Sequence, residues 1–420
     1  MPVKATLPEL RDVDLTDLEV WVEGVPHDWF TLLRNEAPVF WQDELRGRGF
    51  WSLTRYDDVV AASKDYETFS SETGGTSLMD LTPEQIESRK SMLDTDPPRH
   101  TRLRDIVNKG FTPRAVNAYE DRIRALFREI MSQAFERSEL DFVEEVATEL
   151  PMRILCELMG TPLDDRRYLI DLGNRMLGNT DPDHAGEEFV ADRADLARYA
   201  HLPFSSPAAL EMFEYSQKLG DERRREPRDD ITTKLIEADV DGDRLSVHEF
   251  NLFFLLLVTA GNETTRHAMS NGLQALLEHS AERDRLVAEP ALIPTAVDEI
   301  LRWAPSLHHF RRTATRDVEL HGGTIHAGDK VVLWYVSGNR DETQFPAAFR
   351  FDVGRAPNKH LAFGMGGPHF CLGAHFARLE LRVWLEELEP YLGRLELAGS
   401  PARLRSNFFH GIKALPVRVR

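Results

Sequence analysis

One long predicted helix constrains the fold of this chain more than any other feature. Ser246 and Glu249, three residues apart, stand just before an apolar run in the pattern of a capping box that begins a helix. The helical pattern continues to about Glu278, which at ~1.5 Å per residue gives a length of roughly 50 Å. Its middle, FFLLLVTAG over 253–261, is apolar on all sides, as expected of a helix that crosses a protein interior. We therefore expect a large fold built around one buried central helix.

The remaining pattern is mainly α with a minor β portion. Thr112 and Pro113 are a cap followed by a helix-starting proline, and helical spacing continues from there through Phe135. Two apolar segments, 39–41 and 48–55, flank a polar turn and predict a hairpin, and short strands are expected again in the C-terminal third. Further helices are predicted over about 143–160, 164–177, 208–225 and 229–238.

The chain shows no repeat, low-complexity tract or linker. We therefore expect 1–420 to form a single domain, with a short N-terminal extension over about 1–35. Two polar, turn-rich segments, about 71–95 and 178–206, are expected to be long loops, which in compact domains often bind ligands or act as lids.

Charge and composition exclude several classes of protein. The formal net charge of −19 argues against a nucleic-acid partner, because phosphates would be repelled. The apolar stretch Leu252 to Ala260 is far shorter than the ~20 residues of a spanning helix, and the N-terminus shows no signal-peptide core, so no membrane anchor is expected. The chain contains only two cysteines, which suits a reducing, cytoplasmic location.

The segment around Cys371 is the most specific chemical signal. Glycines stand on both sides of this cysteine in FGMGGPHFCLGA, and a helical stretch follows. Main-chain amides and the positive end of a helix both stabilise a thiolate. A single cysteine is a poor zinc site, since zinc takes about three or four protein ligands, whereas haem iron needs one strong protein ligand. Cys156, in an apolar helical segment, is expected to be a buried, inert residue.

The central helix carries polar groups where apolar ones are expected. Ala260-Gly-Asn-Glu263-Thr264-Thr265 places an acid and two hydroxyls in the middle of the apolar stretch. Burying such groups is costly unless they are paired, so they are either satisfied internally or used in function.

These segments together resemble the cytochrome P-450 superfamily. FGMGGPHFCLGAHFAR is similar to its haem-binding loop, and the resemblance extends from about residue 50 to the C-terminus. One departure is an additional residue between Phe363 and Cys371. Gly367, His369 and Gly373 keep their usual distances from the cysteine, so Cys371 is still the expected axial ligand of the haem iron.

The resemblance implies roles for further residues. Thr264 would hold a water near bound dioxygen, and Glu263 would relay protons from solvent. A structural triad, which we do not regard as catalytic, is expected from Glu299, Arg302 and Arg355. The haem propionates would be bound by His100, Arg104, Arg312 and His369. The substrate cavity would be lined by Leu256, Thr259, Ala260, His308 and Phe409. Of the remaining basic residues, Arg102 and Lys109 would face an acidic ferredoxin.

The adjacent histidines His308 and His309 are not interpreted as a metal site. Neighbouring residues of an extended segment point to opposite faces, so the two side chains cannot both bind one ion. His308 is therefore interpreted as a residue that lines the pocket.

The implied activity is that of a haem-thiolate monooxygenase. It would use haem b, O2 and electrons from a ferredoxin with its NAD(P)H-dependent ferredoxin reductase, because no G-x-G-x-x-G fingerprint for a flavin or nicotinamide is present. The helix segment AGNETTRHAMSNG and the longer cysteine loop resemble bacterial members that act on steroid side chains, methyl-branched lipids or terpenoids, so a small apolar substrate is expected. Two alternatives stay open: a peroxide-dependent fatty-acid hydroxylase and a non-catalytic haem-binding sensor.

Overall fold

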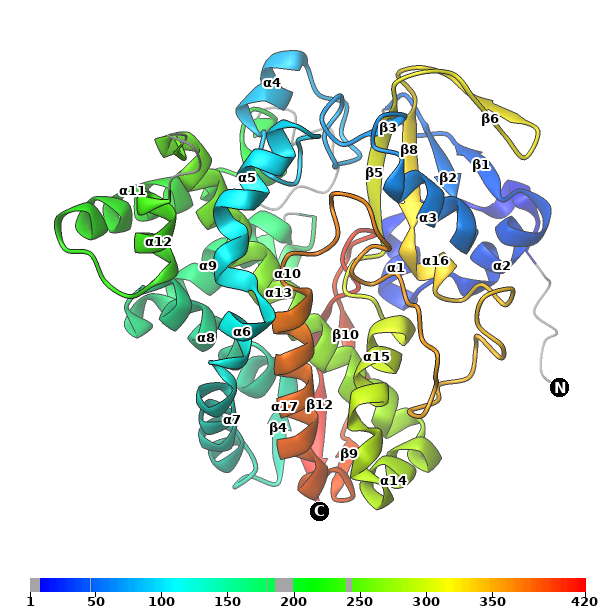
Figure 1. The fold of residues 1–420 in the computed structure, drawn as a ribbon. Coiled ribbons are helices and arrows are strands. Elements are labelled where there is room, and N and C mark those ends of the chain that lie inside the picture. Colours follow the sequence, from blue (N-terminus) through cyan, green and yellow to red (C-terminus); the bar gives the residue numbers. More distant parts are fainter. Residues whose placement is uncertain (1–7, 46, 179, 186–198, 239–243) are drawn as a thin grey trace, which may run out of the picture.

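The structure is a computed structural model, and it describes residues 8–45, 47–178, 180–185, 199–238 and 244–420. The described chain has a large helical part and a smaller part rich in strands (Figure 1). The helices are α1 Leu18–Glu23, α2 His27–Glu36, α3 Tyr56–Lys64, α4 Pro83–Ser88, α5 Arg99–Asn108, α6 Pro113–Asn117, α7 Glu120–Ala134, α8 Glu149–Met159, α9 Arg166–Leu177, α10 Pro182–Ala185, α11 Ala208–Arg225, α12 Ile231–Glu237, α13 Val247–Glu278, α14 Ser280–Ala288, α15 Ile293–Trp303, α16 Tyr335–Gly338 and α17 Ala374–Leu392.

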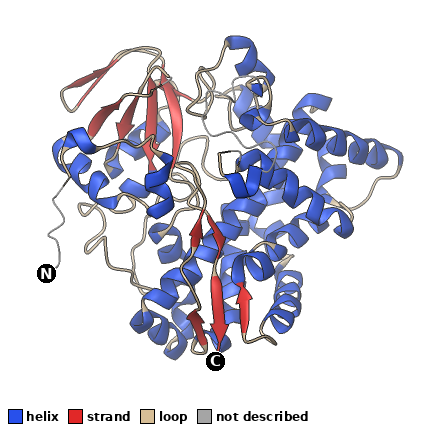
Figure 2. Cartoon of the chain, turned by 180° about the vertical axis from the view of Figure 1, so that it is seen from behind, coloured by secondary structure: helices blue, strands red, loops and turns tan. Residues whose placement is uncertain are grey.

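The strands form one larger sheet and several small ones (Figure 2). The larger sheet has the order β1-β2-β8-β5-β3, in which β2 and β8 are parallel and the other neighbours antiparallel. A three-stranded sheet has the order β4-β12-β9, and two pairs, β6-β7 and β10-β11, complete the set. The strands are β1 Val39–Gln42, β2 Phe50–Leu53, β3 Phe69–Ser70, β4 Glu139–Asp141, β5 His309–Ala314, β6 Val318–Leu320, β7 Gly323–Ile325, β8 Lys330–Trp334, β9 Leu395–Leu397, β10 Ala402–Arg403, β11 Ile412–Ala414 and β12 Pro416–Val419.

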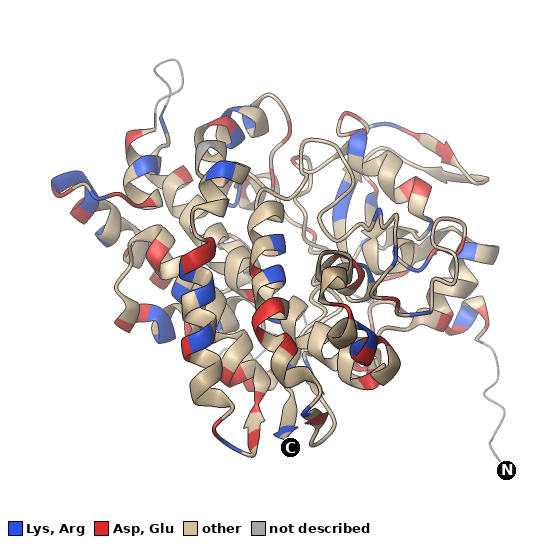
Figure 3. Ribbon diagram, turned by 60° about the horizontal axis from the view of Figure 1, so that its bottom comes forward, with Lys and Arg blue, Asp and Glu red and all other residues tan. Residues whose placement is uncertain are grey.

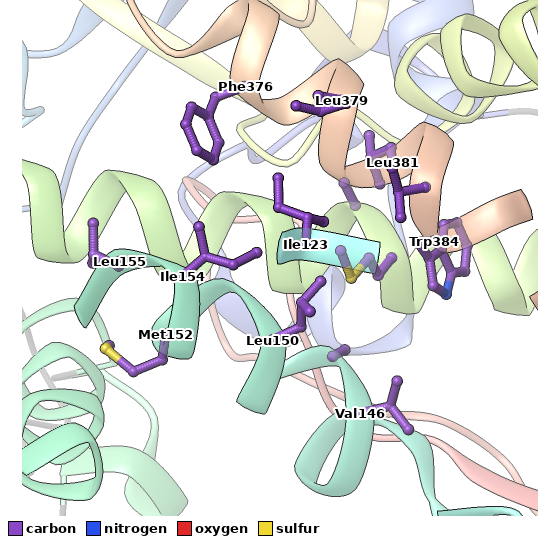
Figure 4. Packing of buried hydrophobic residues seen from close by; sticks show 14 of the residues in the cluster. Ile123, Val146, Leu150, Met152, Ile154, Leu155, Phe376, Leu379, Leu381 and Trp384 are labelled. Carbon is purple, nitrogen blue, oxygen red and sulfur yellow. The ribbon is translucent and has the colours of Figure 1, made fainter. Parts of the chain in front are cut away.

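The central helix is α13, and its capping box is formed as predicted, with the Ser246 hydroxyl accepting from the Glu249 amide. It packs against α8, α11, α15 and α17, so apolar side chains surround it on nearly every side. Figure 4 shows this core from close by, with Leu150 and Ile154 of α8 and Leu381 and Trp384 of α17 gathered around Ile123 of α7. Ala260 and Gly261, in the middle of α13, are nevertheless exposed. A space therefore opens beside the centre of the helix.

The helix α1 and nearly all of α2 lie within the stretch, about 1–35, that the sequence predicts to be an extension. Trp21 and Phe30 are buried there in a cluster with Trp334 of β8. The Trp21 ring also lies 4.5 Å from the ring of His308, between centroids. The main-chain oxygen of Leu15 accepts a 3.0 Å hydrogen bond from the Asn407 side chain, so this stretch is joined to the segment that follows β10.

Several predicted elements are confirmed, and others differ in detail. The hairpin β1-β2 forms, and α11 and α13 have the predicted extents. The helix expected from Pro113 through Phe135 is two helices, because a tight turn at Ala118 and Tyr119, with the Tyr119 amide bonded to the Val116 oxygen, separates α6 from α7. The helix expected from about 143 begins as a π-helical turn, Val143–Ala147, before α8.

The expected long loops contain short helices: α4 lies within 71–95, and α10 lies within 178–206. Residues 179 and 186–198 of the second segment lie outside the described residues. Acidic and basic residues are interspersed along the outer helices (Figure 3). Among the residues described, no helix combines the length and apolar character needed to cross a membrane.

Candidate functional site

A cavity of about 280 Å³ lies between the middle of α13 and the segment that leads into α17. Ala260, Gly261 and Thr264 of α13 form one wall, and Phe363 and Cys371 belong to the opposite wall. Most of the lining is apolar, with Leu155 and Phe253 among the other residues. The two segments that the sequence singles out thus face each other across one space.

The loop before α17 holds Cys371 in place. The Cys371 amide donates a 2.9 Å hydrogen bond to the main-chain oxygen of Phe363. Burial raises the pKa of the Cys371 thiol, while the Gly373 amide and the charges of Arg104 and Arg378 act in the opposite direction. The loop also requires glycine at 367, where φ is +78° and a Cβ atom would collide with the main-chain oxygen of Ser63. The close approach of this loop to the end of α3 therefore positions the sulfur.

One edge of the cavity is cationic. His100, Arg104, Arg312 and His369 all line it, although they come from α5, β5 and the cysteine loop. The rings of His100 and His369 are 4.5 Å apart between centroids. Burial first, then the nearby His369 and Arg104, lowers the pKa of His100 to about 4.

Two ring nitrogens at this edge have no hydrogen-bond partner among the described residues: Nδ1 of His100 and Nε2 of His369. The nearest carboxylate oxygen to His369 Nε2 is that of Asp96, at 3.7 Å, which is too long for a hydrogen bond. Buried ring nitrogens without a partner, beside two guanidinium groups, are an environment that carboxylates would complete. The edge therefore fits the propionates of the haem that the sequence resemblance implies, and the opposite thiol fits its iron.

The acid and the alcohol of α13 point in different directions. The Thr264 side chain lines the cavity, and its hydroxyl donates a 2.6 Å hydrogen bond to the main-chain oxygen of Ala260. Glu263 is buried behind the helix face, where it forms an ion pair with Arg266 and accepts a 3.0 Å hydrogen bond from Asn262. Burial raises the pKa of Glu263, and the charge of Arg266 opposes this. The Glu263 carboxylate does not line the cavity in this conformation.

The three residues of the predicted triad are in contact: Glu299 and Arg302 are completely buried, and the Arg355 side chain is 9% exposed. Arg302 donates two 2.8 Å hydrogen bonds to the two oxygens of Glu299, and Nε of Arg355 donates a third at 3.1 Å. Arg302 also donates to the main-chain oxygens of Asn339 and Ala348, at 2.8 and 2.9 Å. The triad therefore joins α15 to the segment that runs into the cysteine loop.

A second cavity of about 160 Å³ adjoins the first, and Leu93, Leu256 and Phe310 line both. Of the predicted pocket residues, Leu256 and Phe409 line this second cavity and Ala260 the first.

Two predicted pocket residues, Thr259 and His308, are placed outside the lining of both cavities. Thr259 is buried in α13, with its hydroxyl bonded to the Leu255 oxygen at 2.9 Å. The His308 ring packs between Trp21 and His410, at 4.5 and 4.8 Å between centroids. Because side chains alternate along a strand, His309 is the neighbour that lines the second cavity.

Sequence reasoning did not single out the ionisable residues Glu380, Arg89 and Asp94, which line these cavities. Glu380 of α17 lines the first, and burial raises its pKa to about 8. Helical spacing from Gly373 through Ala377 to Glu380 could have placed it on the face of Cys371. Arg89 lines the second cavity and lies in a segment that has no periodic pattern.

One of the two basic residues expected to face a ferredoxin, Arg102, forms a contact within the protein. Arg102 donates a 2.7 Å hydrogen bond to Glu249 at the start of α13. The side chain of Lys109 lies outside what the structure describes.

Comparison with known proteins agrees with this geometry. The family model for cytochrome P450 matches residues 16–388. A methyl-branched lipid omega-hydroxylase of Mycobacterium tuberculosis is 43% identical over 422 residues, which cover 97% of this chain and 95% of the relative. A steroid C26-monooxygenase of Rhodococcus jostii is 38% identical over 421 residues, covering 98% and 85%.

Solved structures agree as well. A Mycobacterium marinum cytochrome P450 in complex with pseudoionone superimposes with a TM-score of 0.87 at 37% identity, covering 99% of this chain and 100% of that one. The chain belongs to the cytochrome P450 family and is a haem-thiolate monooxygenase, which uses dioxygen, a lipophilic substrate and electrons from a redox partner.

Proposed function

We propose that this monooxygenase hydroxylates an elongated apolar molecule: a methyl-branched lipid, a steroid side chain or a terpenoid. The observation that carries the proposal is the pair of adjoining, mostly apolar cavities that lead to a single thiol, Cys371. Leu256, Ala260 and Phe409 would contact the substrate, as would His309 in place of the His308 that the sequence predicts. The names of the relatives, a methyl-branched lipid omega-hydroxylase and a steroid C26-monooxygenase, support the same range of substrates.

We infer that the Cys371 thiolate would hold the haem iron. His100, Arg104, Arg312 and His369 would bind the propionates through charge-assisted hydrogen bonds. When bound, haem b supplies the activation of dioxygen and the transfer of one oxygen atom to a C–H bond. The protein would orient the substrate and exclude water, since apolar residues dominate the lining.

Proton delivery is assigned to Thr264 and Glu263. The Thr264 hydroxyl hydrogen is held by the Ala260 oxygen, so Oγ can accept a hydrogen bond from a water in the cavity. Glu263 would leave Arg266 by rotating its side chain and then carry a proton from solvent toward that water. Its burial, which raises the pKa, favours the protonated form that such a transfer needs.

For the source of electrons we propose a ferredoxin with its NAD(P)H-dependent reductase, and for the location the cytoplasm. The absence of a nucleotide-binding fingerprint in the sequence supports the first, and the two unpaired cysteines Cys156 and Cys371 support the second. A peroxide-dependent hydroxylase would have no need of Thr264 in the cavity wall, and a haem sensor would consume no NADH in response to substrate. Turnover with NADH, a surrogate ferredoxin and its reductase identifies the monooxygenase, and turnover with hydrogen peroxide alone separates a peroxide-dependent hydroxylase from a sensor.

The decisive test is the carbon monoxide difference spectrum of the dithionite-reduced protein. A Soret band near ~450 nm is expected for thiolate-ligated haem. C371S should lose this band, whereas the matched variant C156S should keep it, because Cys156 is buried in α8 and lies outside the cavity lining. A ~450 nm band that survives in C371S, or a native protein that shows only a ~420 nm band, would refute the assignment.

A further inference from the structure

Among the described residues that line the second cavity, one carries a permanent positive charge, Arg89. The second cavity adjoins the first through Leu93, Leu256 and Phe310, so it lies beyond these three residues as seen from Cys371. Arg89 follows α4 directly. A guanidinium group in an apolar wall is costly unless an anion or several acceptors satisfy it. The walls are largely apolar, through Leu78, Leu81, Ile86, Met176, Phe204 and Phe408.

The protein itself satisfies little of this guanidinium. Nη1 of Arg89 donates one hydrogen bond, of 3.3 Å, to the main-chain oxygen of Ala200. No carboxylate of the residues in 8–45, 47–178, 180–185, 199–238 and 244–420 lies within ion-pair distance of it. The adjacent Lys90 differs, because it forms ion pairs with both Glu72 and Glu87, at 2.8 and 2.7 Å. Burial lowers the pKa of Arg89, yet an arginine stays protonated at neutral pH.

One carboxylate, that of Asp94, lines the same cavity but is occupied by other donors. Its Oδ1 accepts hydrogen bonds from the amide and the hydroxyl of Thr76, at 3.1 and 2.7 Å. Its Oδ2 accepts one from the Ser91 hydroxyl at 2.9 Å. The charge of Asp94 still attracts Arg89 from a distance and partly opposes the lowering of the Arg89 pKa by burial. The guanidinium nevertheless keeps donors available for a ligand.

The geometry points to Arg89 as the binding residue for the carboxylate of a fatty-acid substrate. The planar guanidinium offers a fork of N–H donors that matches a carboxylate, and an acyl chain suits the apolar walls. A neutral steroid or terpenoid would leave the charge without an anion. The inference rests on the proposed function, and it narrows the substrate class from apolar molecules in general to acids with a long branched chain.

The position of Arg89 also determines which end of such an acid is oxidised. With the carboxylate in the second cavity, the chain would pass between Leu256 and Phe310 and place its opposite end near Thr264 and Cys371. Hydroxylation is therefore expected at carbons remote from the carboxylate. A substrate bound in the reverse direction would place its charged group in the apolar part of the first cavity, at a large cost in solvation.

The test compares an acid with its ester in the intact holoenzyme. Dissociation constants of 15-methylhexadecanoic acid and its methyl ester would be measured from the spin-state change of the ferric protein, for the native chain, R89M and R89K. R89M should bind the acid about tenfold or more weakly and leave the ester unchanged within about twofold, since one charge-assisted contact is lost. R89K, which keeps the charge without the fork, should lie between the two.

The matched control is R128M, which makes the same substitution at an arginine that is 66% exposed on α7 and paired with Glu387. It should bind both probes as the native protein does. Equal losses for acid and ester in R89M, or equal affinity of the native protein for both, would overturn the assignment of Arg89.

The result can be separated from a failure of the proposed function. A ~450 nm carbon monoxide band in native and R89M proteins shows that the haem site is intact. Testosterone serves as a neutral probe whose binding should not change in R89M. An intact band together with no preference for the acid would refute the role of Arg89 alone, whereas a missing band in the native protein would refute the haem assignment itself.

Discussion

Replacing Glu299 by glutamine tests the buried triad most directly. Glu299 has no exposed surface and accepts five hydrogen bonds, from Arg302 twice, Arg355, Asn358 and the Asp352 amide. The substitution keeps the volume but removes the charge that compensates Arg302, which is itself fully buried. Breaking one partner of a buried pair costs ~3–5 kcal/mol, because the other charge is left uncompensated in a medium of low polarity.

Urea unfolding followed by tryptophan fluorescence measures this cost. At an m-value of ~3 kcal/mol per molar, the loss shifts the urea midpoint downward by about 1 to 1.7 M. The Soret band near ~450 nm should fall in parallel, because the triad holds the segment that leads to Cys371.

The matched control is E386Q, which removes a carboxylate from a partly exposed cluster with Arg124 and Arg382. The loss in free energy of unfolding for E386Q should stay within ~1 kcal/mol, as is usual for ion pairs near the surface. If E299Q is destabilised no more than E386Q, the reasoning about the buried triad is wrong.

Two further predictions concern protons. T264A should consume NADH at an undiminished rate, but most of the electrons should reduce dioxygen to hydrogen peroxide, because the cavity water loses its hydroxyl partner. The amounts of peroxide and of hydroxylated product formed per NADH consumed measure this. If product still forms in a one-to-one ratio to NADH, the role of Thr264 is wrong. Burial, then the charge of Arg403, lowers the pKa of His308 from 6.5 to about 3. The unfolded chain therefore binds a proton below pH 6.5 that the folded chain does not bind until the pH is far lower. Stability from this residue is complete above about pH 6.5 and falls as the pH drops toward about 3, by ~5 kcal/mol at most. Urea midpoints against pH for the native protein and H308Q measure this, and equal slopes would contradict it.

The long helix and the spacing of Glu299 and Arg302 were predictable because both are local signals, whereas only the family resemblance implied that the pair forms a triad with Arg355. Glu299 and Arg302 are one helical turn apart, and Ser246 and Glu249 cap α13 through their own side chains. The glycines on both sides of Cys371 likewise predict, from the local sequence, a loop that holds this cysteine. These features depend little on how distant segments pack.

Pocket residues were harder to predict because they depend on strand register and side-chain rotation. His308 and His309 differ only in the face that they present, and the pairing of His309 with Trp334 sets that face. Glu263 turns away from the cavity because Arg266, one turn later on the same helix, pairs with it. Arg89 reaches a cavity that forms only when α4, α9, α13 and the segment after β10 come together.

The packing of α1 has a consequence for how this enzyme can be shortened or fused to other domains. The segment that carries Ser406, Phe408 and Phe409 forms a wall of the second cavity. The N-terminal helices brace this segment: Glu19 accepts a 2.6 Å hydrogen bond from Arg405, and the main-chain oxygen of Leu15 accepts one from Asn407. Trp21 packs on His308, whose amide donates a hydrogen bond to the Phe408 oxygen. An expression clone that trims the first 35 residues as a dispensable leader would remove this brace. The wall of the second cavity would then lose its support, so substrate preference would change although no residue that contacts the substrate is altered.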